Sequence, residues 1–128
     1  MSPVSNGMSI ALDALKDQIS QATERLKRIP GGEGAEVCTL NCPVSRVRHY
    51  LCFQEGEIMF SQYKPGDDPS HEDTCCFDLA IMDLPVAIRV EAALRIPELI
   101  DNAFAREDEV LGYVEEATLK IKDHLNSV

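Results

Sequence analysis

The sequence predicts an α+β fold: an N-terminal helix, a three- or four-stranded antiparallel β-meander, a short helix and a long C-terminal amphipathic helix, with the helices packed on one face of the sheet. Two observations predict this class. Apolar residues recur at helical spacing near both ends of the chain, and between these regions short alternating runs are separated by turn residues. An antiparallel sheet needs an apolar layer over only one face, and two amphipathic helices can supply that layer.

The C-terminal helix has the most regular pattern in the chain. Positions 96, 100, 103, 107, 110, 114, 117 and 121 advance in steps of four and three, and only Glu107 among them is polar. Pro97 suits the first turn of a helix, because its missing N–H is not needed there. The sequence therefore predicts one helix from Pro97 to Leu125, preceded by a shorter helix from about Pro85 to Arg95.

The N-terminal helix is expected at Ser9–Ile29, with Ser9 as its N-cap. Its apolar residues also fall in steps of three and four, and arginine and lysine fill its last turn, as the helix dipole favours. The run Pro30-Gly31-Gly32 should end it. The organisation that follows is a flexible N-terminus over residues 1–8 and a single α+β domain over residues 9–128.

Strands are predicted between the helices, at residues 36–40, 45–53, 57–63 and 74–81. A two-residue turn at Glu55-Gly56 would pair Phe53 with Ile58 and Leu51 with Phe60, so that apolar side chains face one another. A three-residue turn would bring polar residues opposite apolar ones. The shorter turn is therefore the predicted one.

The composition bounds the function. A net charge of −10 without a lysine or arginine cluster disfavours direct nucleic-acid binding and anionic membranes, and is compatible with a basic protein partner. No apolar run is long enough to span a bilayer, and no signal peptide is visible, so the expected location is cytoplasmic. The five cysteines would then be reduced thiols.

Cysteine and histidine could together form a metal or thiol site. Four residues are candidate zinc ligands, namely Cys38, Cys42, His71 and Cys75. None of their spacings is the CxxC of a zinc knuckle, and free cysteine is commonly a small buried hydrophobe. A zinc-binding or thiol-dependent protein is therefore the alternative function. No cofactor is expected, and His49, on the apolar face of its strand, is expected to be a core histidine.

The preferred function is a small non-enzymatic interaction module that acts as an adaptor or chaperone-like homodimer. Neighbouring carboxylates on a helix do not face one another, so the acidic pairs are expected to be solvated rather than catalytic. The predicted partner surface combines the outward sheet face and an acidic helix flank, at Arg48, Tyr50, Cys52, Met59, Tyr63, Glu109, Glu115 and Glu116.

In element order and acidity the chain resembles the small acidic chaperones of bacterial secretion systems, although the two closing helices depart from that pattern. This resemblance would imply a homodimer that binds another protein. A related alternative is an acidic inhibitor that occupies the nucleic-acid-binding surface of its target, because two segments of the chain concentrate carboxylates.

Overall fold

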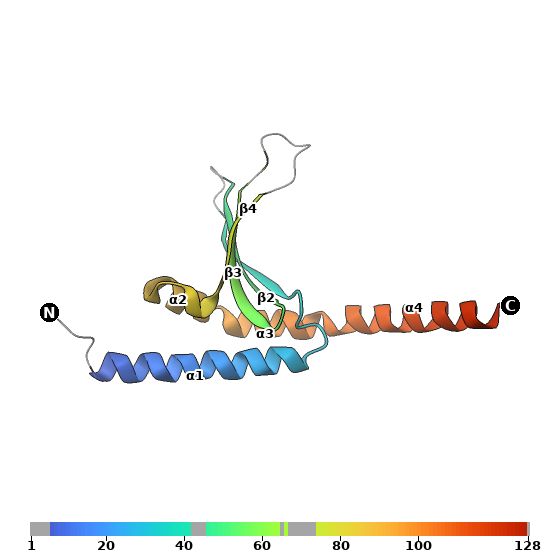
Figure 1. Cartoon of the computed structure of the whole chain (residues 1–128), viewed down its shortest axis with the longest axis horizontal. Coiled ribbons are helices and arrows are strands. Elements are labelled where there is room, and N and C mark those ends of the chain that lie inside the picture. Colours follow the sequence, from blue (N-terminus) through green and yellow to red (C-terminus); the bar gives the residue numbers. More distant parts are fainter. Residues whose placement is uncertain (1–5, 42–45, 65, 67–73, 128) are drawn as a thin grey trace.

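The computed structural model describes residues 6–41, 46–64, 66 and 74–127. The elements follow in the order α1 (Asn6–Arg28), β1 (Glu36–Asn41), β2 (Arg48–Gln54), β3 (Glu57–Lys64), β4 (Thr74–Ala80), a short 3₁₀ turn (Ile81–Asp83), α2 (Val86–Ala93), α3 (Ile96–Ala105) and α4 (Glu107–Asn126). Figure 1 shows a sheet that stands on a layer of helices, with α4 extending away from the rest. The predicted α+β class and element order are confirmed.

The four strands form one antiparallel sheet in the order β1-β2-β3-β4. The hairpin between β2 and β3 has the predicted register, with Phe53 opposite Ile58 and Leu51 opposite Phe60. Its two turn residues have positive φ values, 52° at Glu55 and 78° at Gly56. Positive φ at both central residues is typical of a type I′ turn. The twist of this turn matches that of the flanking strands, which explains why the two-residue loop is adopted.

The core lies between one face of the sheet and the helices α1 and α3. The sheet and both helices contribute fully buried side chains, among them Leu26 of α1, Leu51 and Phe53 of β2, and Leu99 of α3. Asn102 of α3 also donates a hydrogen bond of 2.9 Å to the carbonyl oxygen of Glu36, at the start of β1. This contact fixes α3 against the edge of the sheet.

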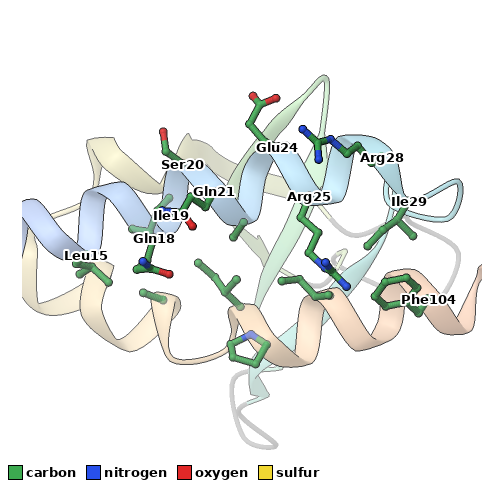
Figure 2. Close-up of a pocket in the computed structure, with 15 residues that line it drawn as sticks. Leu15, Gln18, Ile19, Ser20, Gln21, Glu24, Arg25, Arg28, Ile29 and Phe104 are labelled. Atoms are coloured by element: carbon green, nitrogen blue, oxygen red, sulfur yellow. The ribbon is translucent and has the colours of Figure 1, made fainter.

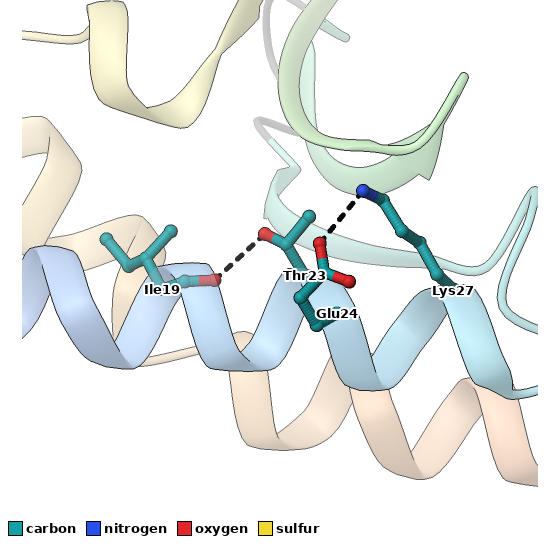
Figure 3. Close-up of polar contacts among 4 residues, drawn as sticks. All are labelled: Ile19, Thr23, Glu24 and Lys27. Carbon is teal, nitrogen blue, oxygen red and sulfur yellow. Dashed lines mark hydrogen bonds and ion pairs between the residues drawn. The ribbon is translucent and has the colours of Figure 1, made fainter.

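Helix α1 begins earlier than predicted. Its first residue is Asn6, so Ser9 lies inside the helix and is not its N-cap. Within α1, the Thr23 hydroxyl donates to the Ile19 carbonyl at 2.8 Å, and the Lys27 ammonium pairs with Glu24 at 2.9 Å (Figure 3). These contacts are internal to α1, so they do not tie the helix to the sheet.

The predicted long helix is divided in two at Arg106. The Arg106 N–H donates to the carbonyls of both Asn102 and Ala103, at 3.2 Å each, which tightens the last turn of α3. The guanidinium of Arg106 donates back to the carbonyl oxygens of Gly31 and Glu33. Helix α3 therefore packs on the sheet as predicted, and α4 begins where this anchor ends.

Helix α4 makes almost no contact with the rest of the protein. None of its residues is buried, although the predicted apolar stripe runs along it. The same stripe is buried in α3, at Ile96 and Ala103. None of the helices in the described part of the chain is long and apolar enough to cross a membrane.

Candidate functional site

A groove of about 920 Å³ lies between α1 and α3. Its floor is apolar, with Ile19, Ile29 and Ile96 buried and Leu15 and Ile100 partly buried. Figure 2 shows the two helices lying side by side along this groove. A mainly apolar groove of this size is typical of a binding site.

One wall of the groove is positively charged. The guanidinium carbon of Arg25 lies 5.3 Å from the centre of the Phe104 ring, so a side chain of α1 reaches across to α3 (Figure 2). Arg28 and Glu24 also line the groove, but Glu24 is paired with Lys27. Among the described residues, no carboxylate forms an ion pair with Arg25 or Arg28. The groove therefore offers an apolar floor with unpaired positive charge beside it.

A second candidate surface is the apolar stripe of α4. Its large side chains are more than half exposed, at Leu111, Val114, Ile121 and Leu125. An isolated helix is marginally stable in water, and most helices in proteins are stabilised by packing of one face. The exposed stripe therefore makes α4 a second candidate binding surface.

The outward sheet face matches the prediction in part. Arg48, Tyr50, Met59 and Tyr63 are partly exposed there, and the rings of Tyr50 and Tyr63 meet edge to face at 5.7 Å. Cys52 does not belong to this surface, because it is only 4% exposed. It lies on a central strand, directly opposite Met59. The predicted partner surface therefore lacks Cys52.

Cys52 begins a polar row across the outer face. Its sulfur lies 4.0 Å from the Ser61 hydroxyl, which donates a 2.5 Å hydrogen bond to Asp78. Burial raises the pKa of the Cys52 thiol from 9.0 to about 11, a rise that the contact with Ser61 partly opposes. A nucleophilic cysteine needs a lowered pKa, so this row has the opposite electrostatics from a thiol active site.

The zinc candidates are divided by the fold. Cys42 and His71 lie outside the described residues, so their positions are untested. Cys38 is on β1 and Cys75 on β4, at opposite edges of the sheet. Three strand spacings separate these edges, about 14 Å at the usual spacing, whereas a zinc–sulfur bond is about 2.3 Å. No group of three metal-binding side chains occurs among the described residues. This spacing argues against one zinc ion bound by both thiols.

Most described cysteines are not the buried hydrophobes that were expected. Cys38, Cys75 and Cys76 are exposed, and only Cys52 is buried. A β-bulge between Gln62 and Tyr63 shifts the register, so that Cys75 stands opposite Tyr63 and not on the core face with Phe77. His49 fits the expected core histidine, since its ring contacts Phe60 and its Nε2 lies 2.8 Å from the amide nitrogen of Gln62.

The predicted acidic flank lies along α4. Glu109, Glu115 and Glu116 are all exposed. Glu109 accepts a hydrogen bond from Tyr113, and Glu116 pairs with Lys120 at 2.8 Å. The fold does not join this flank to the outer face of the sheet, because α4 extends away from the sheet (Figure 1). The residues predicted as one partner surface therefore form two separate ones.

The groove residues and Arg106 were not predicted as a site. A helical stripe identifies the apolar face of a helix, but it does not show whether another helix packs tightly against that face. Comparison with known proteins adds no assignment: no protein-family model, no curated protein and no solved structure matches this chain.

Proposed function

We propose that this chain is a non-enzymatic protein-interaction module, an adaptor or chaperone-like homodimer, that holds a helical segment of another protein in the groove between α1 and α3. The groove is the observation that supports this function most directly. Its width is set by two helices lying side by side, and its floor is apolar along Ile19, Ile96 and Ile100. A third helix that buries an apolar face there would complete a helical layer beneath the sheet.

The chemistry of the groove specifies its occupant. An amphipathic helix needs an apolar stripe for the floor and an acidic edge for the wall that carries Arg25 and Arg28. The net charge of −10 would by itself favour a basic partner. The Debye length is about 8 Å at physiological salt, and charges within this distance of the contact dominate docking. The arginines beside the groove therefore favour a negatively charged edge on the partner helix.

The described side chains support binding more than catalysis. The one polar row with a buried thiol has a raised pKa at Cys52, and it lies on the outer sheet face, on the other side of the sheet from the groove. The groove is lined by apolar residues, two glutamines, two arginines, Ser20 and Glu24, and by no described cysteine or histidine. An acidic inhibitor would use the carboxylates of α4, but no contact within the fold arranges them as a concave surface.

Affinity capture with the intact chain from its native host tests this function when a variant pair accompanies it. Phe104→Glu places a charge in the groove at a ring that is 41% exposed, so it should abolish capture of the specific partner without unfolding the protein. Leu94→Glu is the matched control, because Leu94 is 74% exposed and does not line the groove. Loss of the partner from both variants, or from neither, would contradict the proposal.

The sign of the partner's charge is tested with the purified pair. A peptide that spans the captured partner's amphipathic helix should bind, and replacing its acidic edge with lysines should weaken binding about tenfold or more. Stronger binding of the lysine peptide would instead indicate a basic partner and the acidic flank of α4 as its docking surface.

A further inference from the structure

Helix α4 carries an apolar arc that nothing in the described chain covers. At 100° per residue, eight residues of α4 fall within an arc of about 120°; six are apolar, Val110, Leu111, Val114, Ala117, Ile121 and Leu125, and the other two are Glu107 and Thr118. All of these except Val110 are exposed. The arc continues the stripe that is buried in α3, so the same face that packs on the sheet in α3 lies open in α4.

Heptad spacing along this face runs through 107, 110, 114, 117, 121 and 124, with His124 about 20° beyond the edge of the arc. As in any heptad series of this kind, the steps are three, four, three, four and three in either direction. A second copy of α4 running the opposite way therefore meets the first in register, with Val110 opposite Ile121 and Val114 opposite Ala117. A parallel copy would instead place each residue opposite itself.

The two polar members of the stripe fit the antiparallel arrangement. Glu107 and His124 are the first and last of the six positions. In an antiparallel pair, Glu107 of each copy lies opposite His124 of the other copy, which joins a carboxylate to a cationic or hydrogen-bonding ring. In a parallel pair, Glu107 would face Glu107 and like charges would repel.

The remaining charges of α4 also differ between the two halves of the helix. Residues 107–116 contain five carboxylates and no lysine or arginine, whereas residues 117–126 contain Lys120, Lys122 and a single carboxylate, Asp123. Antiparallel pairing places the acidic half of each helix level with the lysine-bearing half of the other. The charge pattern therefore favours this orientation and disfavours the parallel one.

The space around α4 also suits a second helix. Facing positions sum to 231, so Asn126 of the second copy lies level with Ala105, the last residue of α3. The second helix would end where the body of the first protein begins, and the two bodies would lie at opposite ends of the pair. The contact is the same for both copies, so it closes as a two-fold dimer and leaves no arc uncovered.

We propose that α4 pairs with α4 of a second copy of this chain in an antiparallel two-fold contact, with Glu107 of each copy opposite His124 of the other. This pairing rests on the homodimer of the proposed function and gives that dimer its interface. It leaves the groove between α1 and α3 free for another protein.

Sedimentation velocity on the intact chain tests the interface with a matched pair of variants. Ile121 and Leu119 are almost equally exposed, at 61% and 60%, but they point about 160° apart on the helix. Ile121→Glu should convert the dimer to a monomer, and Leu119→Glu should leave it dimeric. Equal effects of the two substitutions, or a dimer that survives Ile121→Glu, would overturn the proposal.

A charge exchange tests the register. Glu107→Lys should weaken the dimer about tenfold, because it removes the two symmetric contacts between Glu107 and His124. Adding His124→Glu should restore the dissociation constant to within about threefold of the wild type. No restoration would refute the antiparallel register.

Failure of this interface and failure of the proposed function are distinguishable. A wild-type chain that is monomeric contradicts the homodimer itself. A wild-type dimer that survives Ile121→Glu contradicts only the pairing of α4. A dimer broken by Phe104→Glu would show that the groove holds the second copy, which overturns the α4 pairing and also the proposed partner of the groove.

Discussion

Arg106, at the junction of α3 and α4, donates a hydrogen bond of 2.9 Å to the backbone carbonyl of Glu33, which lies 73 residues earlier in the chain. The same guanidinium donates to the carbonyl of Gly31 at 3.3 Å. This side chain fastens the loop between α1 and β1 to the end of α3. It therefore fixes both one end of the groove and the point at which α4 leaves the body.

Replacing Arg106 should destabilise the fold. Arg106→Ala removes two hydrogen bonds from a charged donor to partly exposed carbonyls, which should lower the free energy of unfolding by about 1–2 kcal/mol. Urea denaturation measures this change. Arg95→Ala is the control, because Arg95 forms only an exposed i,i+3 pair with Glu98 and should cost about 0.5 kcal/mol or less. Equal losses would show that Arg106 is not a specific anchor.

Gly31 is required by close packing of the same loop. A Cβ at Gly31 would lie 2.4 Å from the carbonyl oxygen of Ala103 and 2.7 Å from Cβ of Arg106. Gly31→Ala should therefore lower the free energy of unfolding by about 1–3 kcal/mol, because the backbone must move. Gly112, in α4, has no atom within 4 Å of such a Cβ. Gly112→Ala should instead raise helicity and stabilise α4 by about 0.5–1 kcal/mol. Thermal melts followed by circular dichroism compare the two, and a tolerated Gly31→Ala would contradict the packing.

Cys52 should be the least reactive of the described cysteines. Burial raises the pKa of its thiol to about 11, so almost no thiolate is present at pH 8, whereas Cys38, Cys75 and Cys76 are exposed. Alkylation with iodoacetamide, read by peptide mass spectrometry, should modify these three and spare Cys52. Early modification of Cys52 in the folded protein would contradict its burial.

The same shift makes stability depend on pH in a defined window. The folded state holds the Cys52 proton up to about pH 11, while the unfolded thiol loses it near 9.0, so the unfolded state binds fewer protons between these values. The contribution is fully present below pH 9 and is lost as the pH rises to 11. The unfolding free energy of the wild type, measured relative to that of Cys52→Ala, should therefore be constant below pH 9 and fall between pH 9 and pH 11.

The β2–β3 turn offers a stabilising substitution. Glu55 has a φ of 52°, a conformation that asparagine tolerates better than glutamate. Glu55→Asn should raise the free energy of unfolding by about 0.5 kcal/mol, measured by urea denaturation. Glu57→Asn is the comparison, because Glu57 lies in β3 without a positive φ and should gain nothing from the change. A gain in both variants, or in neither, would disagree with the turn geometry.

The hairpin was predictable because side-chain phase and turn chemistry agree. Only the two-residue loop at Glu55-Gly56 places Leu51 opposite Phe60 on a shared apolar face, and the structure has this register. Strict alternation would place Cys75 on the same face as Phe77, but the bulge after Gln62 moves the strand by one residue. No glycine or proline marks that bulge, so an uninterrupted alternation was the natural expectation.

The candidate surfaces were less predictable than the elements that build them. The stripe from Ile96 to Ile121 shows which side of the helix is apolar, but a stripe is the same whether a sheet, a neighbouring helix or a second copy covers it. The break at Arg106 decides which part of the stripe is buried, because α3 before the break is packed and α4 after it is exposed. The anchor depends on carbonyls more than 70 residues away, which local pattern does not encode.

The central claim is that α4 pairs two copies of the chain, and the mass of the intact chain in solution tests this claim most directly. The wild type and Ile121→Glu are compared at about 50 μM, a concentration above micromolar dissociation constants. We expect a wild-type mass of twice the 14.2 kDa chain and a variant mass equal to a single chain. A wild type that sediments as a single chain, or a variant that remains double, would contradict it.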